Sequence, residues 1–202
     1  MSTRKKTGFV DIDTQRDFMV SRGRLYVQGA RTIGNAIRRL VAHAGQRGYR
    51  LFSSVDAHSE DDPEFDQFPP HCVQGTRGQQ KIRGTVLDDH VVVAPDRKLS
   101  PQAIDDLLGH DQIIIEKQAF EIFDNPNTTP ILRASGCTRF LVFGVATDYC
   151  VRAAVLGLRT LDYPVTVVED AIRGVAPDTT EQALAEMRDA GARFKTLDQV
   201  LR

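Results

Sequence analysis

Cys150 is the residue whose sequence context best suits covalent chemistry. It ends the segment 144–150 (GVATDYC), where a pattern typical of a buried strand gives way to one typical of a helix. A cysteine near a helix N-terminus lies beside the positive end of the helix dipole and beside free backbone amides, and both favour the thiolate. A plain core cysteine is the alternative, because free cysteine is commonly buried.

Two other ionisable residues follow apolar segments and suit the activation of a thiol. Asp13 comes directly after residues 7–12, and a carboxylate whose pKa is raised by burial can accept a thiol proton. Lys117 follows the apolar run 113–115, and its ammonium group would lower the pKa of a neighbouring thiol or carboxyl. Taken singly, Asp13 is more typical of an acidic turn and Lys117 of an exposed surface position.

A second group of residues has the chemistry of metal ligands. It comprises Asp56, His58, Glu64 and His71, all within a stretch of 16 residues. Imidazole nitrogens and carboxylate oxygens together suit zinc, iron or manganese, with water completing the coordination sphere. An isolated acidic residue and histidine in a loop would more often be solvated surface. His71, which follows two prolines, makes that alternative weaker.

Strand-like and helix-like segments alternate along the chain, which predicts a mostly parallel sheet covered on both faces. We expect an α/β fold, a three-layer α/β/α sandwich with about six strands. The expected strands are 7–12, 50–55, 91–93, 112–116, 139–145 and 164–168, with 194–196 as a possible edge strand. The expected helices are 27–43, one beginning near 101, 130–134, 148–159, 179–190 and a short closing one.

The site residues are expected at one edge of this sheet. Asp13, Asp56, Lys117 and the segment after Val145 all follow the ends of expected strands. In parallel sheets ligands bind beyond the carboxyl ends of the strands, so these residues are predicted to meet in one crevice. Residues 57–89 show no regular period, and a loop of that length inside a compact domain is typical of a functional segment.

Composition excludes several classes of protein. The chain has 202 residues, 41% hydrophobic and 26% charged, which predicts one globular domain over residues 1–202. The net charge of -1 and the scattered basic residues argue against a nucleic-acid partner. No stretch is long and apolar enough for a membrane span or a signal peptide, so no membrane partner and a cytoplasmic location are expected. Three cysteines cannot all pair within the chain, so at least one is free.

Three motifs together carry a resemblance to a known family. Residues 13–18 (DTQRDF) resemble an acid-bearing first loop, residues 56–58 (DAH) and 69–76 (PPHCVQGT) a metal loop, and residues 146–151 (ATDYCV) a nucleophile turn. In this order, over nearly the whole chain, they are similar to the nicotinamidase branch of the isochorismatase-like cysteine hydrolases. The resemblance implies that family's α/β fold and an amidohydrolase activity.

The resemblance also implies roles for single residues. It assigns a catalytic triad, a metal set, an oxyanion site, a cis peptide bond and three pocket aromatics. The triad is Asp13, Lys117 and Cys150; the ligands are Asp56, His58, His71 and, least securely, Glu64; the oxyanion amides are those of Ala146 and Cys150, after a cis Val145–Ala146 bond; and the aromatics are Phe18, Phe68 and Tyr149. One divalent ion is implied, with zinc expected first and iron or manganese as alternatives. A homo-oligomer is also expected.

The reaction implied by the resemblance is hydrolysis of nicotinamide to nicotinate and ammonia through a cysteine thioester, as in NAD salvage. Two alternatives remain open. One is a sister amidase acting on another small amide, against which the metal loop argues. The other is a catalytically silent, metal-dependent binding module. An isochorismate-type ether hydrolase is disfavoured by the presence of Cys150.

Overall fold

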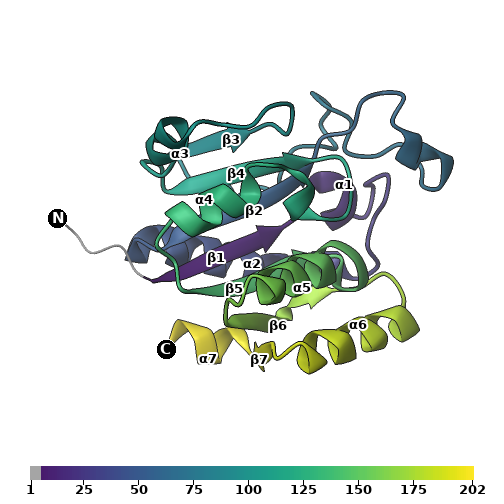
Figure 1. Ribbon diagram of the computed structural model, residues 1–202. Coiled ribbons are helices and arrows are strands. Elements are labelled where there is room, and N and C mark those ends of the chain that lie inside the picture. Colours follow the sequence, from purple (N-terminus) through teal and green to yellow (C-terminus); the bar gives the residue numbers. More distant parts are fainter. Residues whose placement is uncertain (1–5) are drawn as a thin grey trace.

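The structure is a computed structural model that describes residues 6–202. Residues 1–5, which were included in the expected domain and in the search for a signal peptide, lie outside the described residues. One sheet forms the middle layer, and helices cover both of its faces (Figure 1). The expected three-layer α/β/α sandwich is therefore confirmed.

The sheet has seven strands in the order β3-β4-β2-β1-β5-β6-β7, and every recorded pair is parallel. Parallel pairing throughout agrees with the apolar character of the central strands, which are buried on both faces. The strands are β1 (Thr7–Ile12), β2 (Arg50–Asp56), β3 (His90–Val93), β4 (Gln112–Lys117), β5 (Arg139–Val145), β6 (Val165–Arg173) and β7 (Arg193–Lys195).

Each face of the sheet has its own hydrophobic core. On one face Ile37 and Leu40 of the long helix α2 pack with Leu197 of α7; on the other, Val155 of α5 packs with Met187 of α6. The helices are α1 (Arg16–Met19), α2 (Ala30–Arg47), α3 (Pro101–Leu107), α4 (Thr128–Ala134), α5 (Arg152–Thr160), α6 (Pro177–Asp189) and α7 (Leu197–Leu201), with short turns η1 (Pro63–Asp66), η2 (Ile122–Asp124) and η3 (Thr147–Val151).

Element bounds shift at several places, as at β6, which runs to Arg173 where 164–168 was expected, and three differences concern which elements form. The possible edge strand at 194–196 is real and becomes β7, so the sheet has seven strands where about six were expected. The short helix α1 was not predicted, because four residues show no helical period. The predicted helix 148–159 begins instead as the π-helical turn η3, and regular α-helix starts only at Arg152. Hydrophobic period alone does not distinguish these two kinds of turn.

The order of strands creates a switch point at the middle of the sheet. β1 and β5 are neighbours, yet the chain leaves β1 toward α2 on one face and leaves β5 toward α5 on the other. A crevice opens where neighbouring connections diverge in this way, beyond the carboxyl ends of the strands. Asp13 follows β1 and Cys150 follows β5, so this crevice lies between them.

Two further expectations concern cysteines and membranes. Within residues 6–202, none of the three cysteines is in a disulfide, and all three are buried. No helix in the described part of the chain combines the length and the apolar character that crossing a bilayer requires.

Candidate active site

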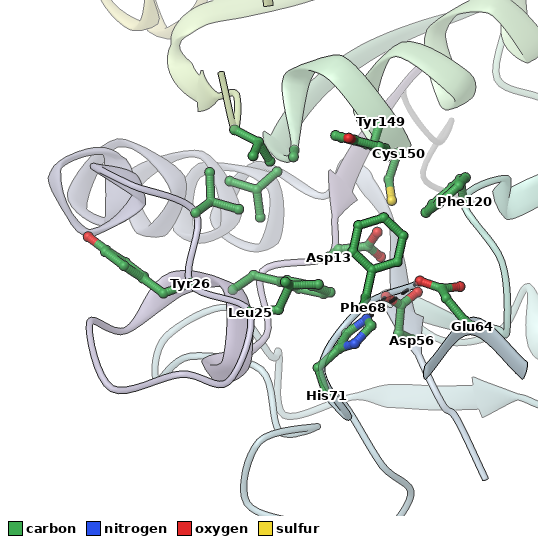
Figure 2. Close-up of a pocket in the computed structure, with 15 residues that line it drawn as sticks. Asp13, Leu25, Tyr26, Asp56, Glu64, Phe68, His71, Phe120, Tyr149 and Cys150 are labelled. Atoms are coloured by element: carbon green, nitrogen blue, oxygen red, sulfur yellow. Dashed lines mark ion pairs between the residues drawn. The ribbon is translucent and has the colours of Figure 1, made fainter. Parts of the chain in front are cut away.

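Four neighbouring strands each deliver one ionisable residue to the same edge of the sheet. In spatial order, β4 ends at Lys117, β2 ends at Asp56, β1 leads into Asp13, and β5 leads into the turn that carries Cys150. The structure thus brings together the residues that the strand-end argument selected. Figure 2 shows the Cys150 sulfur pointing into the same cavity as the Asp13 and Asp56 carboxylates.

Asp13 reaches this cavity because the backbone leaves the strand at that residue. Its φ is 47°, in the left-handed region, which breaks the alternation of side chains along β1. The Ser54 hydroxyl donates to Asp13 Oδ1 at 2.6 Å, and the Asp13 amide donates back to Ser54 Oγ at 3.2 Å. These two bonds fix the carboxylate against β2.

Lys117 lies at the centre of the cluster. Its Nζ is 2.9 Å from Asp13 Oδ2 and 3.6 Å from Cys150 Sγ, and it also donates to Asp56 Oδ1. The side chain is only 1% exposed, so the alternative of a surface lysine is excluded. A buried ammonium group is stable only when it is paired, and here two carboxylates share it. Its pKa is raised well above the ordinary value, because these carboxylates outweigh the opposing effect of burial.

Burial is the largest influence on the pKa of the other two members of the cluster, Asp13 and Cys150. It raises the pKa of Asp13 above its ordinary value, although Lys117 opposes the shift. It also raises the pKa of Cys150 well above its ordinary value, again against Lys117. The expected lowering by Lys117 is present, but burial outweighs it. A thiol whose pKa is raised needs a base to remove its proton before it can act as a nucleophile.

Three potential metal ligands converge beside this cluster. One donor atom from each of Asp56, His58 and His71 lies within 4.8 Å of the other two. His58 Nε2 is 3.7 Å and His71 Nε2 is 3.8 Å from Asp56 Oδ2. Ligands bound about 2.1 Å from one ion are about 3.0–3.4 Å apart, so the donors would need to move closer together to share one ion.

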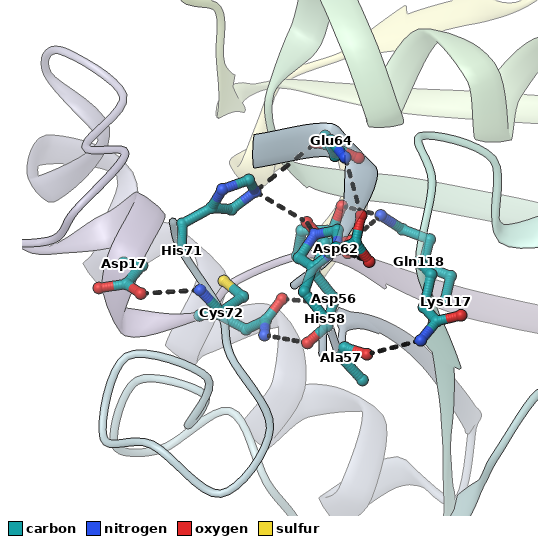
Figure 3. Close-up of polar contacts among 12 residues, drawn as sticks. Asp17, Asp56, Ala57, His58, Asp62, Glu64, His71, Cys72, Lys117 and Gln118 are labelled. Carbon is teal, nitrogen blue, oxygen red and sulfur yellow. Dashed lines mark hydrogen bonds and ion pairs between the residues drawn. The ribbon is translucent and has the colours of Figure 1, made fainter. Parts of the chain in front are cut away.

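Each of the two histidines has a hydrogen-bond acceptor beside Nδ1. His58 Nδ1 is 2.9 Å from Asp62 Oδ2, and His71 Nδ1 is 2.9 Å from the Pro69 carbonyl. Donation from Nδ1 leaves Nε2 free to coordinate. His58 Nε2 is buried without a hydrogen-bond partner in the described part of the chain, which is unfavourable unless a ligand satisfies it. The residues present therefore fit a divalent cation (Figure 3).

The charges around Asp56 and His58 favour a positive charge between these potential ligands. Burial alone would lower the pKa of His58, but Asp56 and Asp62 raise it to about 9. Burial alone would raise the pKa of Asp56, but Lys117 and His58 hold it below its ordinary value. The acidic surroundings thus keep a proton on His58 at neutral pH, and a bound dication would replace that proton.

Glu64 is close to the three ligands but separate from them. It lies on η1, with Oε1 3.7 Å from His71 Nε2, and its side chain is 15% exposed. Asp62 caps η1 by accepting from the Glu64 amide at 2.9 Å while it also contacts His58. Sequence reasoning missed Asp62. Its signals were its position four residues after His58 and its place as a cap directly before Pro63.

The three predicted aromatics all line the cavity. Phe18 lies edge-on to His71, with ring centroids 5.4 Å apart, and Phe68 and Tyr149 form another wall, with ring centroids 6.3 Å apart. Phe120 completes that wall, with its centroid 6.1 Å from that of Phe68 and 5.4 Å from that of Tyr149. Phe120 was not predicted, although it lies three residues beyond Lys117 on a loop that leaves the carboxyl end of a strand.

The turn that carries Cys150 follows a cis peptide bond. The Val145–Ala146 peptide bond is cis, as the resemblance implied. The amides of Tyr149 and Val151 both donate to the Ala146 carbonyl, at 3.1 and 3.0 Å. Ala146 caps this turn and Cys150 lies within it, so their amides belong to the same turn as the thiol.

Comparison with known proteins agrees with this geometry. The profile of the isochorismatase domain matches residues 7–199. The chain is 31% identical to the nicotinamidase/pyrazinamidase of Mycobacterium tuberculosis over 193 residues, covering 91% of this chain and 95% of that protein. It is 28% identical over 198 residues to an Arabidopsis thaliana protein named "Probable inactive nicotinamidase", covering 96% of this chain and 94% of that one.

A solved structure shows the same fold. The pyrazinamidase of Pyrococcus horikoshii in complex with zinc matches with a TM-score of 0.77 and 27% identity, covering 95% of this chain and 99% of that chain. The family profile covers more than half of this chain, and the Mycobacterium relative matches over nearly all of it. The chain therefore belongs to the isochorismatase domain family.

Proposed function

We propose that this chain is a nicotinamidase, a metal-dependent amidohydrolase that converts nicotinamide to nicotinate and ammonia. One observation carries the proposal: Lys117 contacts Asp13, Cys150 and Asp56, so it joins the thiol and its base to the metal ligands. A binding module would not need a buried thiol beside a carboxylate of raised pKa. Strongly shifted groups gathered in a cleft are typical of catalysis.

The cavity supports a substrate the size of one small ring. Its volume is about 100 Å³, of the same order as the engineered protein cavity of about 150 Å³ that holds benzene. The aromatic residues in its lining favour a flat ring, which stacks on them or meets them edge-on. His71 and Cys150 both line this cavity, so a planar amide is expected with its ring near the metal ligands and its carbonyl carbon beside the sulfur.

Acylation begins with transfer of the Cys150 thiol proton to Asp13. The sulfur then bonds to the carboxamide carbon, and the carbonyl electron pair moves onto oxygen, which accepts from the amides of Ala146 and Cys150. As the carbonyl re-forms, the C–N bond breaks, and the proton from Asp13 passes to the nitrogen so that ammonia leaves. Lys117 balances the negative charge that moves between sulfur and carboxylate.

Deacylation repeats these steps with water. Asp13, again a carboxylate, takes a proton from water as the oxygen adds to the thioester carbon. The C–S bond then breaks, and the sulfur regains its proton from Asp13. The product leaves as the carboxylic acid and becomes nicotinate by losing a proton to solvent. The same carboxyl group thus acts as base and acid in both halves, which requires a pKa near the working pH, and burial shifts it in that direction.

The metal is proposed to be held by Asp56, His58 and His71, with Glu64 contributing directly or through water. A divalent ion held by these residues would supply open coordination positions, which could bind a ring nitrogen of the substrate. Zinc suits this donor set, as do iron and manganese. A cytoplasmic role in NAD salvage and a homo-oligomeric state complete the proposal.

The test is ammonia release from nicotinamide by purified protein, before and after removal of metal. The proposal expects release that falls on chelation and returns when zinc is added back. A sister amidase would release ammonia from another small amide and little from nicotinamide. No release from any small amide by a folded, zinc-loaded sample would instead favour a silent module.

A further inference from the structure

Asp11 and Lys81 form a second buried ion pair next to the proposed active site. Lys81 Nζ is 2.9 Å from Asp11 Oδ2, with side chains 3% and 0% exposed. Asp11 also accepts from Ser53 Oγ at 3.4 Å, whereas Asp13 is bonded to Ser54. Ser53 and Ser54 are successive residues of β2, and successive side chains of a strand point to opposite faces of the sheet. The two acids that contact them therefore lie on opposite faces.

Lys81 belongs to a segment that runs antiparallel to the loop containing Asp13. The Arg16 amide donates to the Gln80 carbonyl at 2.8 Å, and the Ile82 amide donates to the Thr14 carbonyl at 2.9 Å. Gln15 and Lys81 form the bridge between these two bonds. The segment 78–82 therefore acts as a short partner strand for residues 14–17.

The same ladder reaches the metal ligands through Gln15. Gln15 Oε1 accepts from the Asp56 amide at 2.7 Å, and Gln15 Nε2 donates to the Asp56 carbonyl at 2.8 Å. Nε2 also donates to the Gln79 carbonyl at 2.9 Å. The amide and the carbonyl of Asp56 are thus both hydrogen-bonded to the side chain of Gln15. The segment 78–82 holds that side chain in position.

A buried ion pair of this kind contributes little net stability, because desolvation of the two charges offsets their attraction. Its stronger effect is to select one register, since a shifted pairing would leave both charges buried and unpaired. Lys81 Nζ also donates to Thr14 Oγ1 at 2.8 Å, directly beside Asp13. The pair thus fixes the ladder at the residue that precedes the base.

We propose that Asp11 and Lys81 are a positioning pair: they fix the register of residues 78–82 against 14–17 and so hold Asp13 and Asp56 in reactive geometry. Neither residue lines the cavity. The inference rests on the proposed function for its catalytic consequence. Its consequences for metal binding and for the ladder itself do not depend on the substrate.

The test compares Lys81→Met with the double variant Asp11→Leu/Lys81→Met. The single variant leaves a buried carboxylate unpaired and should lose both thermal stability and activity. The double variant removes both charges, so its thermal midpoint should return to near the parent value. Its kcat should nevertheless stay about 10- to 100-fold low with KM little changed, because small displacements of catalytic groups are costly.

Two readouts apart from activity accompany these kinetics. Zinc affinity, measured by competition with a chelator, should fall about tenfold in the double variant, as when groups that orient ligands are altered. The Arg16 and Ile82 amides should exchange with deuterium faster than in the parent. Arg50→Met is the matched control: this buried cation begins β2 at the opposite end and caps the Leu108 and His110 carbonyls. It should lower stability and leave zinc affinity unchanged.

A double variant with parent kcat, zinc affinity and amide protection would overturn the positioning role. A Lys81→Met variant with the parent kcat, zinc affinity and amide protection would also overturn it. If the parent releases no ammonia, the proposed function fails, and zinc affinity and amide exchange still decide the role of the pair.

Discussion

Lys117 Nζ lies 2.9 Å from Asp13 Oδ2, and both side chains are 1% exposed. This contact keeps the proposed base and its counter-ion away from bulk solvent, although Asp13 still lines the cavity. Because Lys117 also pairs with Asp56, one buried cation serves two carboxylates. The other carboxylate oxygen of Asp56 faces His58 and His71, where a dication fits.

Replacement of the nucleophile should separate binding from turnover. In Cys150→Ala the cavity and the metal ligands remain, so nicotinamide should still bind, while ammonia release falls by about 10⁴-fold or more, as in other hydrolases that lose their nucleophile. Binding is measured by calorimetry and release by an ammonia assay. Cys137→Ala is the control, because Cys137 is buried in the core and does not line the cavity. Unchanged turnover in Cys150→Ala would refute the nucleophile.

Ser54 should set the acid limb of the pH profile. Asp13 must be ionised to accept the thiol proton, so kcat/KM should fall as the pH drops through its pKa, which burial raises above the ordinary carboxyl value. The Ser54 hydroxyl stabilises the ionised form and opposes that rise. Ser54→Ala should therefore move the acid limb to higher pH, as measured from kcat/KM across a pH series.

Ser135→Ala is the control for this shift, since the Ser135 hydroxyl donates to the Leu132 carbonyl in α4, away from the site. Its acid limb should coincide with that of the parent. An acid limb that stays in place in Ser54→Ala would mean that a group other than Asp13 controls it.

Asp62 should control metal affinity without being a ligand. Asp62→Ala removes the acceptor for His58 Nδ1 and also the cap of η1, so zinc binding should weaken about 10- to 100-fold. Asp62→Asn retains an acceptor oxygen and the ability to cap, and its loss should be smaller. Competition with a chelator measures both. Equal zinc affinity in the parent and Asp62→Ala would show that His58 is oriented without this carboxylate.

Sequence reasoning located the site because the fold follows from hydrophobic patterning. Parallel strands deliver their carboxyl ends to one edge, so residues that follow apolar runs were expected to meet, and Asp13, Asp56 and Lys117 do lie together. The metal ligands needed the chemistry of their side chains as well as their placement. The seventh strand was harder to predict, because three residues at a sheet edge show almost no period.

Contacts between loops were beyond this reasoning. Asp62, Phe120 and Lys81 owe their roles to the path of irregular segments, which hydrophobic period does not encode. Strict alternation along β1 would also place Asp11 and Asp13 on the same face. The left-handed backbone at Asp13 reverses that outcome, and a non-glycine residue in this region is uncommon.

Phe120 should limit the size of the substrate. Its ring is 40% exposed and meets Phe68 and Tyr149 at the cavity wall, so it covers a bound ring on the side open to solvent. Phe120→Ala should lower kcat/KM for nicotinamide about threefold to tenfold, in line with the loss of about 0.5–1.5 kcal/mol of aromatic contact. The same variant should gain activity toward ring amides with an added substituent. Val92→Ala is the matched control, since this exposed side chain lies on the edge strand β3 and does not line the cavity. If Phe120→Ala and Val92→Ala give the same substrate preference as the parent, Phe120 does not form the wall that selects small rings.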